Sequence, residues 1–119
     1  MKIQKTGADL EKIVKVKMLV EKMVKSKFKV SYKHSISTNT YYIRLSNYEG
    51  VYYDLRFSDH KSKNKKIKTF YFNNNRKEDL EKFIKDGIRK METKQVRYLF
   101  EKIAWIKKGL RFFYINIIL

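Results

Sequence analysis

The hydrophobic period of this sequence changes twice along the chain, and no other feature constrains the fold as strongly. Apolar residues recur about every 3.6 positions over residues 10–28, at every second position over residues 28–57, and with helical spacing again from residue 80 onward. The first spacing gives a helix one apolar face, and the second gives a strand one apolar face. The order of the periods therefore predicts helix, then sheet, then helix, which is an α+β fold.

The first helix is predicted over residues 8–26. Thr6 and Asp9 form a T-x-x-D pattern directly before the apolar run, as is typical of a helix N-terminus. Four strands are expected to follow, separated by turns rich in Asn, Thr, Ser or Gly and by one basic loop. Their predicted ranges are residues 28–37, 41–46, 51–58 and 67–72. Because the connections are short, we expect an antiparallel meander.

The last third of the chain returns to helical spacing. One apolar face is carried by Leu80, Phe83, Ile84, Ile88 and Met91, and a second run by Val96, Leu99, Phe100, Ile103 and Ile106 ends at Gly109. Whether Thr93 separates two helices or one helix continues is left open by the pattern. Residues 110–119 are rich in Phe and Ile, and we expect a final edge strand there. The prediction is thus a single α+β domain over residues 1–119, with one or two C-terminal helices.

Positive charge dominates the composition. Lys and Arg total 29 against 12 Asp and Glu, a formal net charge of +17. An AT-rich genome would enrich Lys, Asn and Ile in any protein, which explains part of this excess. Self-repulsion opposes compaction, so selection for folding alone would not favour the remainder. The charge indicates a polyanionic or acidic partner without saying which one.

Composition also excludes several classes of site. The sequence has no Cys and only two His, which excludes disulfides, thiolate nucleophiles, cysteine-bound metals and multi-histidine centres. We expect no cofactor and no metal. The first residues lack the apolar core of a secretory signal, and no apolar run approaches the roughly 20 residues that cross a bilayer. We therefore expect a cytoplasmic protein of a bacterial host cell, with no membrane partner.

The densest basic cluster lies between the third and fourth predicted strands. Five of its eight positions are lysine, namely Lys61, Lys63, Lys65, Lys66 and Lys68. Loop lysines can each contact a phosphate, which gives salt-sensitive affinity without sequence preference. On the adjacent strands, the outward face is predicted to carry Arg44 and Arg56 with Tyr42 and Tyr52, which would add forked hydrogen bonds and stacking surfaces. The alternative is a solvated loop whose lysines block edge-to-edge aggregation.

Catalytic patterns are weak. His34 falls on the apolar side of its strand, which predicts a core histidine with satisfied hydrogen bonds. Asp59 and His60 are adjacent and could orient a general base, although such a pair is more often part of a turn. There is no metal-ligand spacing, glycine-rich phosphate loop or Ser-His-Asp set. We expect a non-enzymatic protein, with one class left open: small basic endoribonuclease toxins, which need only Lys, Arg and Tyr around a phosphate.

Two strand ends share one pattern, Ile43-Arg44-Leu45-Ser46-Asn47-Tyr48 and Leu55-Arg56-Phe57-Ser58-Asp59-His60. In this pattern, and in the order of its elements over residues 10–91, the chain resembles a group of small phage and mobile-element proteins with an I-R-(L/F/I)-S-(N/D) strand end. The group includes broad-spectrum inhibitors of type II CRISPR effector nucleases. The resemblance implies a stoichiometric inhibitor that binds the effector or its guide RNA and keeps target nucleic acid out. It marks as candidate contacts Arg44, Asn47, Arg56, Asp59 and His60, with no catalytic role.

Three functions are thus weighed. The leading hypothesis is an anti-CRISPR-like protein whose partner is a CRISPR effector ribonucleoprotein. The second is a general DNA- or RNA-binding protein, and the third is a ribonuclease toxin. Residues 110–119 could pair with another part of the chain or across a two-fold axis, so a homodimer through the C-terminal segment is also expected as an option.

Overall fold

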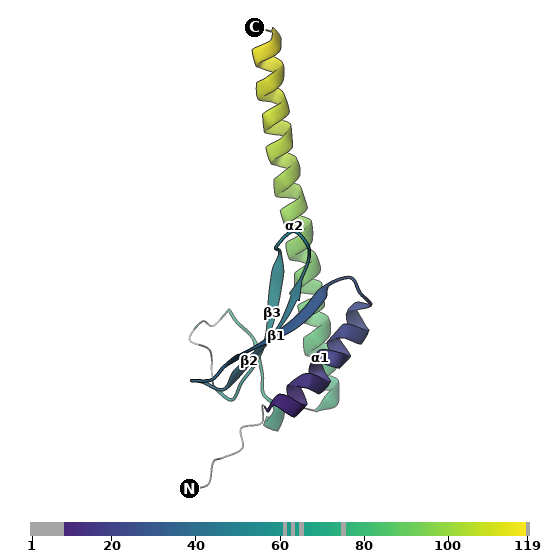
Figure 1. Cartoon of the computed structure of the whole chain (residues 1–119), viewed down its shortest axis with the longest axis vertical. Coiled ribbons are helices and arrows are strands. Elements are labelled where there is room, and N and C mark those ends of the chain that lie inside the picture. The colour runs from purple at the N-terminus through teal and green to yellow at the C-terminus, as the bar shows by residue number, and fades with distance from the viewer. Residues whose placement is uncertain (1–8, 61, 63, 65, 75, 119) are drawn as a thin grey trace.

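Two helices pack against one face of a four-stranded sheet, and the second helix continues far beyond it (Figure 1). This arrangement comes from a computed structural model, which describes residues 9–60, 62, 64, 66–74 and 76–118. It confirms the predicted α+β class, with an N-terminal helix, a mostly antiparallel sheet and a C-terminal helix.

The first helix, α1, spans Leu10–Val24, within two residues of the predicted bounds. Asp9 is its N-cap, and its side-chain Oδ1 accepts a hydrogen bond of 2.9 Å from the backbone N–H of Lys12. The helix ends where Lys25 takes the left-handed conformation, with φ at 49°. Thr6, the other half of the predicted N-terminal pattern, lies outside the described residues.

The sheet has the order β1-β2-β3-β4. Its strands are β1 (Lys29–Ser35), β2 (Thr40–Ser46), β3 (Tyr52–Phe57) and β4 (Thr69–Phe70). The first three are antiparallel neighbours, as the short turns predicted. Register is set by the turn at residues 47–51, where the backbone N–H of Asn47 donates to the carbonyl of Val51 at 3.1 Å.

The fourth strand differs from its prediction. We expected residues 67–72 to run antiparallel, but β4 has two residues and pairs parallel to β3, with Arg56 opposite Thr69 and Phe57 opposite Phe70. Antiparallel strands can be joined by a tight turn, whereas a parallel partner needs a connection of about a dozen residues or more, to bring the chain back to the starting end. The connection over residues 58–68 is long enough to return the chain in this way, and the strand pairs only briefly before a 3-10 turn at Phe72–Asn74.

The C-terminal region is one helix, α2, which spans Lys77–Ile118 and has 42 residues. Thr93 therefore lies inside a continuous helix, which answers the question that the pattern left open. Two expectations were wrong: the helix does not stop at Gly109, and residues 110–118 form no final strand. One glycine costs a helix only about 1 kcal/mol relative to alanine. The strand preference of Phe and Ile, in turn, is realised only where a neighbouring strand is present to pair with.

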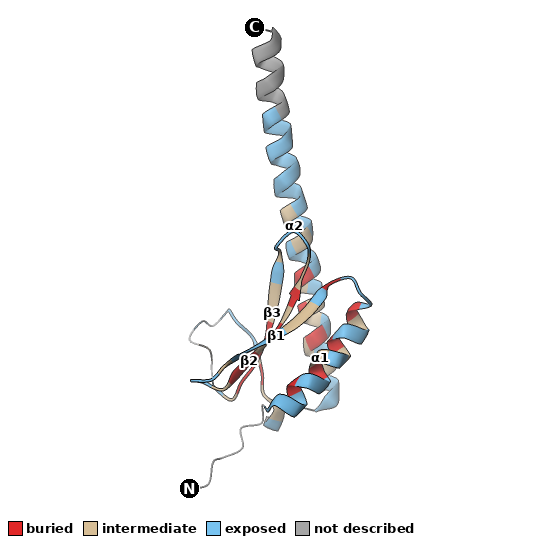
Figure 2. Cartoon of the chain, viewed as in Figure 1, coloured by how far each residue is buried: buried red, intermediate tan, exposed pale blue. Residues whose placement is uncertain are grey.

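The core lies between the helices and the inner face of the sheet (Figure 2). Its most deeply buried apolar side chains come from both layers: Ile13, Val20, Ile43, Leu45, Leu55, Phe57, Ile84 and Met91. Phe57 packs against the rings of Phe70, Phe72 and Phe83, with ring centroids 5.5–6.0 Å apart. Met91 is the last buried residue of α2 among those described. Beyond it, Lys94 and Lys102 still contact the β2–β3 hairpin, at the carbonyl of Tyr52 and the carboxylate of Glu49, before the helix projects from the body.

The projecting helix makes the molecule elongated. Its Cα radius of gyration is 19.3 Å and its principal extents are 77 × 30 × 19 Å. A compact chain of this length would have a radius of gyration of about 13.5 Å. Within the described part of the chain, no helix combines the length and apolar character that crossing a membrane requires.

Candidate nucleic-acid interface

The face of the sheet turned away from the helices carries the predicted functional residues. Pairing places Ser31, Arg44 and Asp54 in one cross-strand row, Lys33, Tyr42 and Arg56 in a second, and Lys29, Ser46 and Tyr52 in a third. We call these nine residues the open face. Their neighbours along each strand, such as Ile43 and Leu55, point into the core. The prediction that Arg44, Arg56, Tyr42 and Tyr52 share one face is therefore confirmed by the register.

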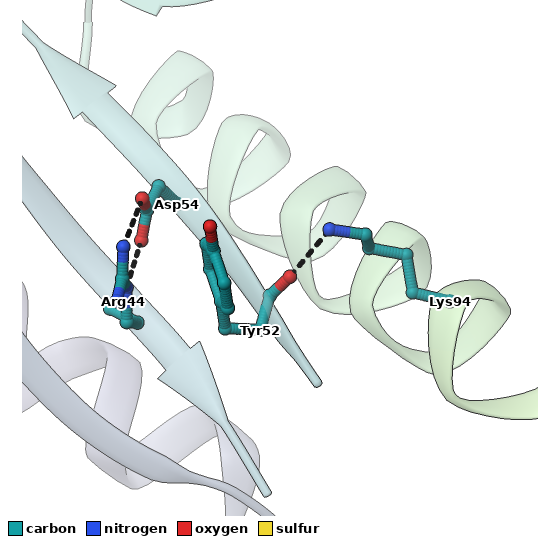
Figure 3. A network of polar contacts seen from close by, with 4 residues as sticks. All are labelled: Arg44, Tyr52, Asp54 and Lys94. Carbon is teal, nitrogen blue, oxygen red and sulfur yellow. Dashed lines mark hydrogen bonds and ion pairs between the residues drawn. The ribbon is translucent and has the colours of Figure 1, made fainter. Parts of the chain in front are cut away.

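Arg44 lies at the centre of a polar network on the open face (Figure 3). Its Nε and one terminal nitrogen donate to the two carboxylate oxygens of Asp54, at 2.8 and 3.0 Å. Its guanidinium also stacks on the ring of Tyr52, 3.8 Å from the centroid. Lys94 from α2 completes the group: its Nζ donates to the backbone carbonyl of Tyr52 at 2.6 Å and lies 5.1 Å from the same ring.

This network fixes the charge and the orientation of Arg44. The hydrogen bonding that Arg44 donates to Asp54 raises the pKa of the Arg44 guanidinium, although partial burial acts in the opposite direction. The side chain nevertheless stays 43% exposed. A planar cation held by a carboxylate edge and an aromatic face is pre-organised for stacking and for phosphate contact, because little conformational entropy remains to be lost on binding.

The cations of the edge strand β1 are more exposed to solvent than Arg44. Lys29 and Lys33 are exposed and alternate with the half-buried Ser31 along the open face. A shallow hollow beside them is lined by Ser31, Tyr32, Lys33, His34, Ser35, Tyr42, Arg44 and Asp54. Because Asp54 offsets the charge of Arg44, the net positive charge of this surface comes mainly from the two lysines of β1.

Arg56 shares the open face but is only 6% exposed. One terminal nitrogen donates to the backbone carbonyl of His60, at 2.8 Å, and to the hydroxyl of Thr69. These bonds join the end of β3 to the returning loop and to β4. Arg56 therefore stabilises the fold, and little of its side chain is available to a partner.

Asn47 lies in the β2–β3 turn, at one end of the sheet. Its side-chain Oδ1 accepts hydrogen bonds from the backbone N–H groups of Glu49 and Val51, at 2.9 and 3.0 Å. Its Nδ2 is buried and has no hydrogen-bond partner among the described residues. The strand-end asparagine therefore closes the turn that sets the register of Arg44 against Asp54.

Asp59 and His60 lie at the opposite end of β3, so the structure does not bring them together with Asn47. The backbone N–H of His60 donates to the hydroxyl of Ser58 at 3.1 Å, while Arg56 holds its carbonyl. The Oδ2 of Asp59 is buried without a hydrogen-bond partner in the part of the chain that the structure describes. The backbone contacts of His60 are those of a turn.

The basic loop is described only in part. Lys66 is exposed, and its backbone N–H donates to the side chain of Asn64 at 3.0 Å. Lys68 is also exposed, with its Nζ 3.7 Å from a carboxylate oxygen of Asp86 on α2. Lys61, Lys63 and Lys65 lie outside the described residues, and their predicted role stays a prediction.

His34 does not occupy the core position that its alternation predicted. It is exposed near the end of the edge strand β1, where its Nε2 lies 2.8 Å from the Oδ1 of Asn39 and its ring stacks on Tyr41 at 4.0 Å. The reason is that the helices do not cover the far end of β1, so the apolar side of that strand is open to solvent there. Alternation gives the side of the sheet, but not how far the covering layer extends.

Two members of the Arg44 network were not singled out from the sequence. Asp54 could have been found, because a hairpin turn after Ser46 with Tyr52 as its partner places Arg44 opposite Asp54. Lys94 could not, since it lies 42 positions from Tyr52 in the chain and reaches it only through the docking of α2 on β3.

Among the described residues, no group of three or more His, Asp or Glu side chains is placed to hold a metal ion. Comparison of the chain with protein-family models, with curated proteins and with solved structures finds no significant match. Function is therefore inferred from the residues and from the geometry of the open face.

Proposed function

We propose that this protein is a non-enzymatic inhibitor of the anti-CRISPR type, which binds a CRISPR effector nuclease or its guide RNA through the open face and blocks target nucleic acid. The observation that carries the proposal is the position of Arg44. The I-R-L-S-N strand end, on which the family resemblance rests, places Arg44 in the middle of an uncovered sheet face, stacked on Tyr52.

The chemistry of the open face suits RNA. A sheet face that carries aromatic rings among cations is the arrangement with which several RNA-binding modules stack unpaired bases and hold phosphates. Tyr42 and Tyr52 supply rings, Arg44 supplies a planar cation, and Lys29 and Lys33 supply mobile charge along the edge. Binding by such a face needs no sequence readout, which agrees with occlusion as the mechanism.

The test is inhibition of purified type II effectors assembled with guide RNA. Target cleavage should fall as the protein approaches one equivalent per effector, and the double variant Lys29→Gln, Lys33→Gln should need several-fold more protein. The matched control is Lys22→Gln, Lys82→Gln, which removes the same charge from exposed positions on α1 and α2. Full cleavage by a broad set of effectors at excess protein would overturn the anti-CRISPR proposal.

General nucleic-acid binding is the second candidate, favoured by the two exposed lysines of β1 rather than by the strand-end pattern. It predicts that free single-stranded RNA binds in gel-shift titrations with a steep dependence on salt. Removing Lys29 and Lys33 should reduce the slope of log affinity against log salt by about 1 to 2. Binding of free RNA without effector inhibition would favour this second function over the first.

A further inference from the structure

The projecting half of α2 exposes an apolar stripe that the body of the molecule does not cover. Its described members are Val96, Leu99, Ile103 and Ile106, which are 43–53% exposed. They follow one another at spacings of 3, 4 and 3 residues. Met91, one turn earlier, is fully buried against the body, so the stripe begins where the packing of α2 on the sheet ends.

The same spacing continues in the sequence to Leu110, Phe113 and Ile117, within the helix that extends to Ile118. Alternating steps of 3 and 4 define positions a and d of a heptad repeat, and the pattern here extends over three heptads. Position a carries Val96 and Ile103 and position d carries Leu99 and Ile106, so every described a and d position is apolar, as a coiled-coil seam requires. Phe100 at position e and Trp105 at position c are also exposed, at 69% and 77%, but the continuous apolar row is the one at a and d, which favours a second helix as its partner.

The exposed area is large enough for such a partner. The chain exposes 9894 Å², whereas a compact protein of 14.5 kDa exposes about 6,900 Å². The difference, about 3,000 Å², belongs to the whole elongated chain and exceeds the roughly 1,200–2,000 Å² that stable interfaces commonly bury. Residues 99–109 contribute to this excess, since all of those described are exposed.

We propose that a second copy of this chain covers the stripe, and that the two α2 helices form an antiparallel coiled coil. In a parallel pair, Lys102 at position g would face Lys107 at position e of the second copy. Glu49 of the same chain, 3.6 Å from the Nζ of Lys102, offsets one of these two cations, and the second stays uncompensated in a chain of net charge +17. In an antiparallel pair with Ile103 against Ile106 of the second copy, Lys102 faces Gly109 and Phe100 faces Lys107. The contacts lie on α2, apart from the open face.

The first test measures the mass of the full-length protein by sedimentation equilibrium over a range of concentrations. The wild type should be a dimer, and Ile103→Lys should raise the dissociation constant by on the order of 100-fold or more, because it places a charge in the seam. The matched control is Trp105→Lys, which changes a residue that is 77% exposed and lies off the seam. The control should remain dimeric, and circular dichroism should show both variants helical.

A wild type that is monomeric at 100 μM, or a control that dissociates as much as Ile103→Lys, would overturn the proposal. Co-flotation of monomeric wild type with vesicles containing phosphatidylserine would also overturn it, by showing that the stripe binds a membrane surface. Orientation is tested by oxidation, since the native chain has no cysteine. The double variant Lys102→Cys, Gly109→Cys should form covalent dimers, because these two positions face each other in the antiparallel pair. The single variant Val96→Cys should not, and cross-linking of Val96→Cys alone would contradict the antiparallel arrangement.

Discussion

Arg44 shows how one residue can be both structural and exposed. Its hydrogen bonds to Asp54 and its stacking on Tyr52 fix the guanidinium, yet 43% of the side chain stays accessible. The ion pair also reduces the positive charge of the open face. A negatively charged partner is therefore attracted by Arg44 and repelled by Asp54. Substituting each residue separately measures the two effects.

We predict that Arg44→Ala and Asp54→Asn change RNA affinity in opposite directions. Arg44→Ala removes a cation and a stacking surface and leaves the Asp54 carboxylate unpaired, so affinity should fall on the order of 5-fold. Asp54→Asn removes a negative charge and frees Arg44, so affinity should rise. Each variant should lose less than about 1 kcal/mol of unfolding free energy, because the pair is partly solvated. Gel-shift titrations and urea denaturation measure the two quantities, and equal changes in affinity would contradict this role.

A second residue-scale prediction concerns acid stability. Burial acts to raise the pKa of Asp86, but the hydrogen bond from Lys90 and the charges of Lys90, Lys68 and Arg89 outweigh it and lower the pKa below its usual 3.8. A lowered folded-state pKa stabilises the protein above about pH 4, and this contribution is lost as the pH falls through the folded value.

Asp86→Asn should therefore destabilise the protein at pH 7, and by less at pH 2.5. Because the side chain is 37% exposed, the difference at pH 7 should be under about 1 kcal/mol. Urea unfolding at both pH values measures it, with Glu92→Gln on the same helix as the control for loss of one negative charge. A difference that grows towards low pH would contradict the sign.

At the scale of elements, α2 docks on the sheet through a glycine. A Cβ at Gly87 would lie 2.2 Å from Cδ2 and 3.3 Å from Cγ of Leu55, which is itself 1% exposed. The helix approaches β3 closely because this position has no side chain. The close approach also explains how Lys94, two turns further along α2, reaches the carbonyl of Tyr52.

Gly87→Ala and Gly109→Ala should have opposite effects on stability. Both gain about 1 kcal/mol of helix propensity. At Gly87 the added methyl must displace buried Leu55, which costs about 1–3 kcal/mol, so we expect a net loss on the order of 1 kcal/mol. At Gly109 the new Cβ would meet nothing within 4 Å apart from its chain neighbours and the backbone of its own helix turn, so stability should rise. Urea denaturation at one fixed protein concentration checks both, and a stabilised Gly87→Ala would show that Leu55 relaxes freely.

At the scale of the whole molecule, shape and charge act together. A radius of gyration of 19.3 Å spreads the net charge of +17 over a long body, which reduces self-repulsion relative to a sphere. The carboxylates of the described ion pairs, such as Lys17 with Glu21 and Lys90 with Asp86, are already counted in that net charge, so 17 positive charges remain uncompensated within the chain. Net repulsion should therefore be the main electrostatic influence on folding.

We expect the melting temperature to rise with salt. Between 20 and 200 mM NaCl the screening length falls from about 20 to about 7 Å, which weakens repulsion between distant lysines more than attraction within contact pairs. A gain on the order of 1 kcal/mol corresponds to about 4 °C for a chain of this size. Differential scanning fluorimetry at fixed pH measures the shift. A melting temperature that falls with salt would show that ion pairs outweigh net repulsion.

The sequence carried the prediction of the fold further than that of the site. The periods located α1 and the first three strands, and the open face followed from alternation along β2 and β3. Errors arose where a long-range contact decides the outcome. His34 is exposed because the helices do not cover the end of β1, and Arg56 is buried because β4 returns beside it. Neither the extent of the helix layer over β1 nor the position of β4 can be predicted from the local pattern of residues.

Local patterns along the chain were sufficient to predict the order of helix, sheet and helix and the face to which each strand residue points, and composition showed the excess of positive charge. These depend on backbone geometry and composition, which act locally. Three features became visible only in the folded chain: β4 is parallel, Arg44 is held between Asp54 and Tyr52, and α2 continues as one helix past the body. These depend on which surfaces remain to be covered once the core has formed. Which surfaces remain uncovered is a property of the packed chain.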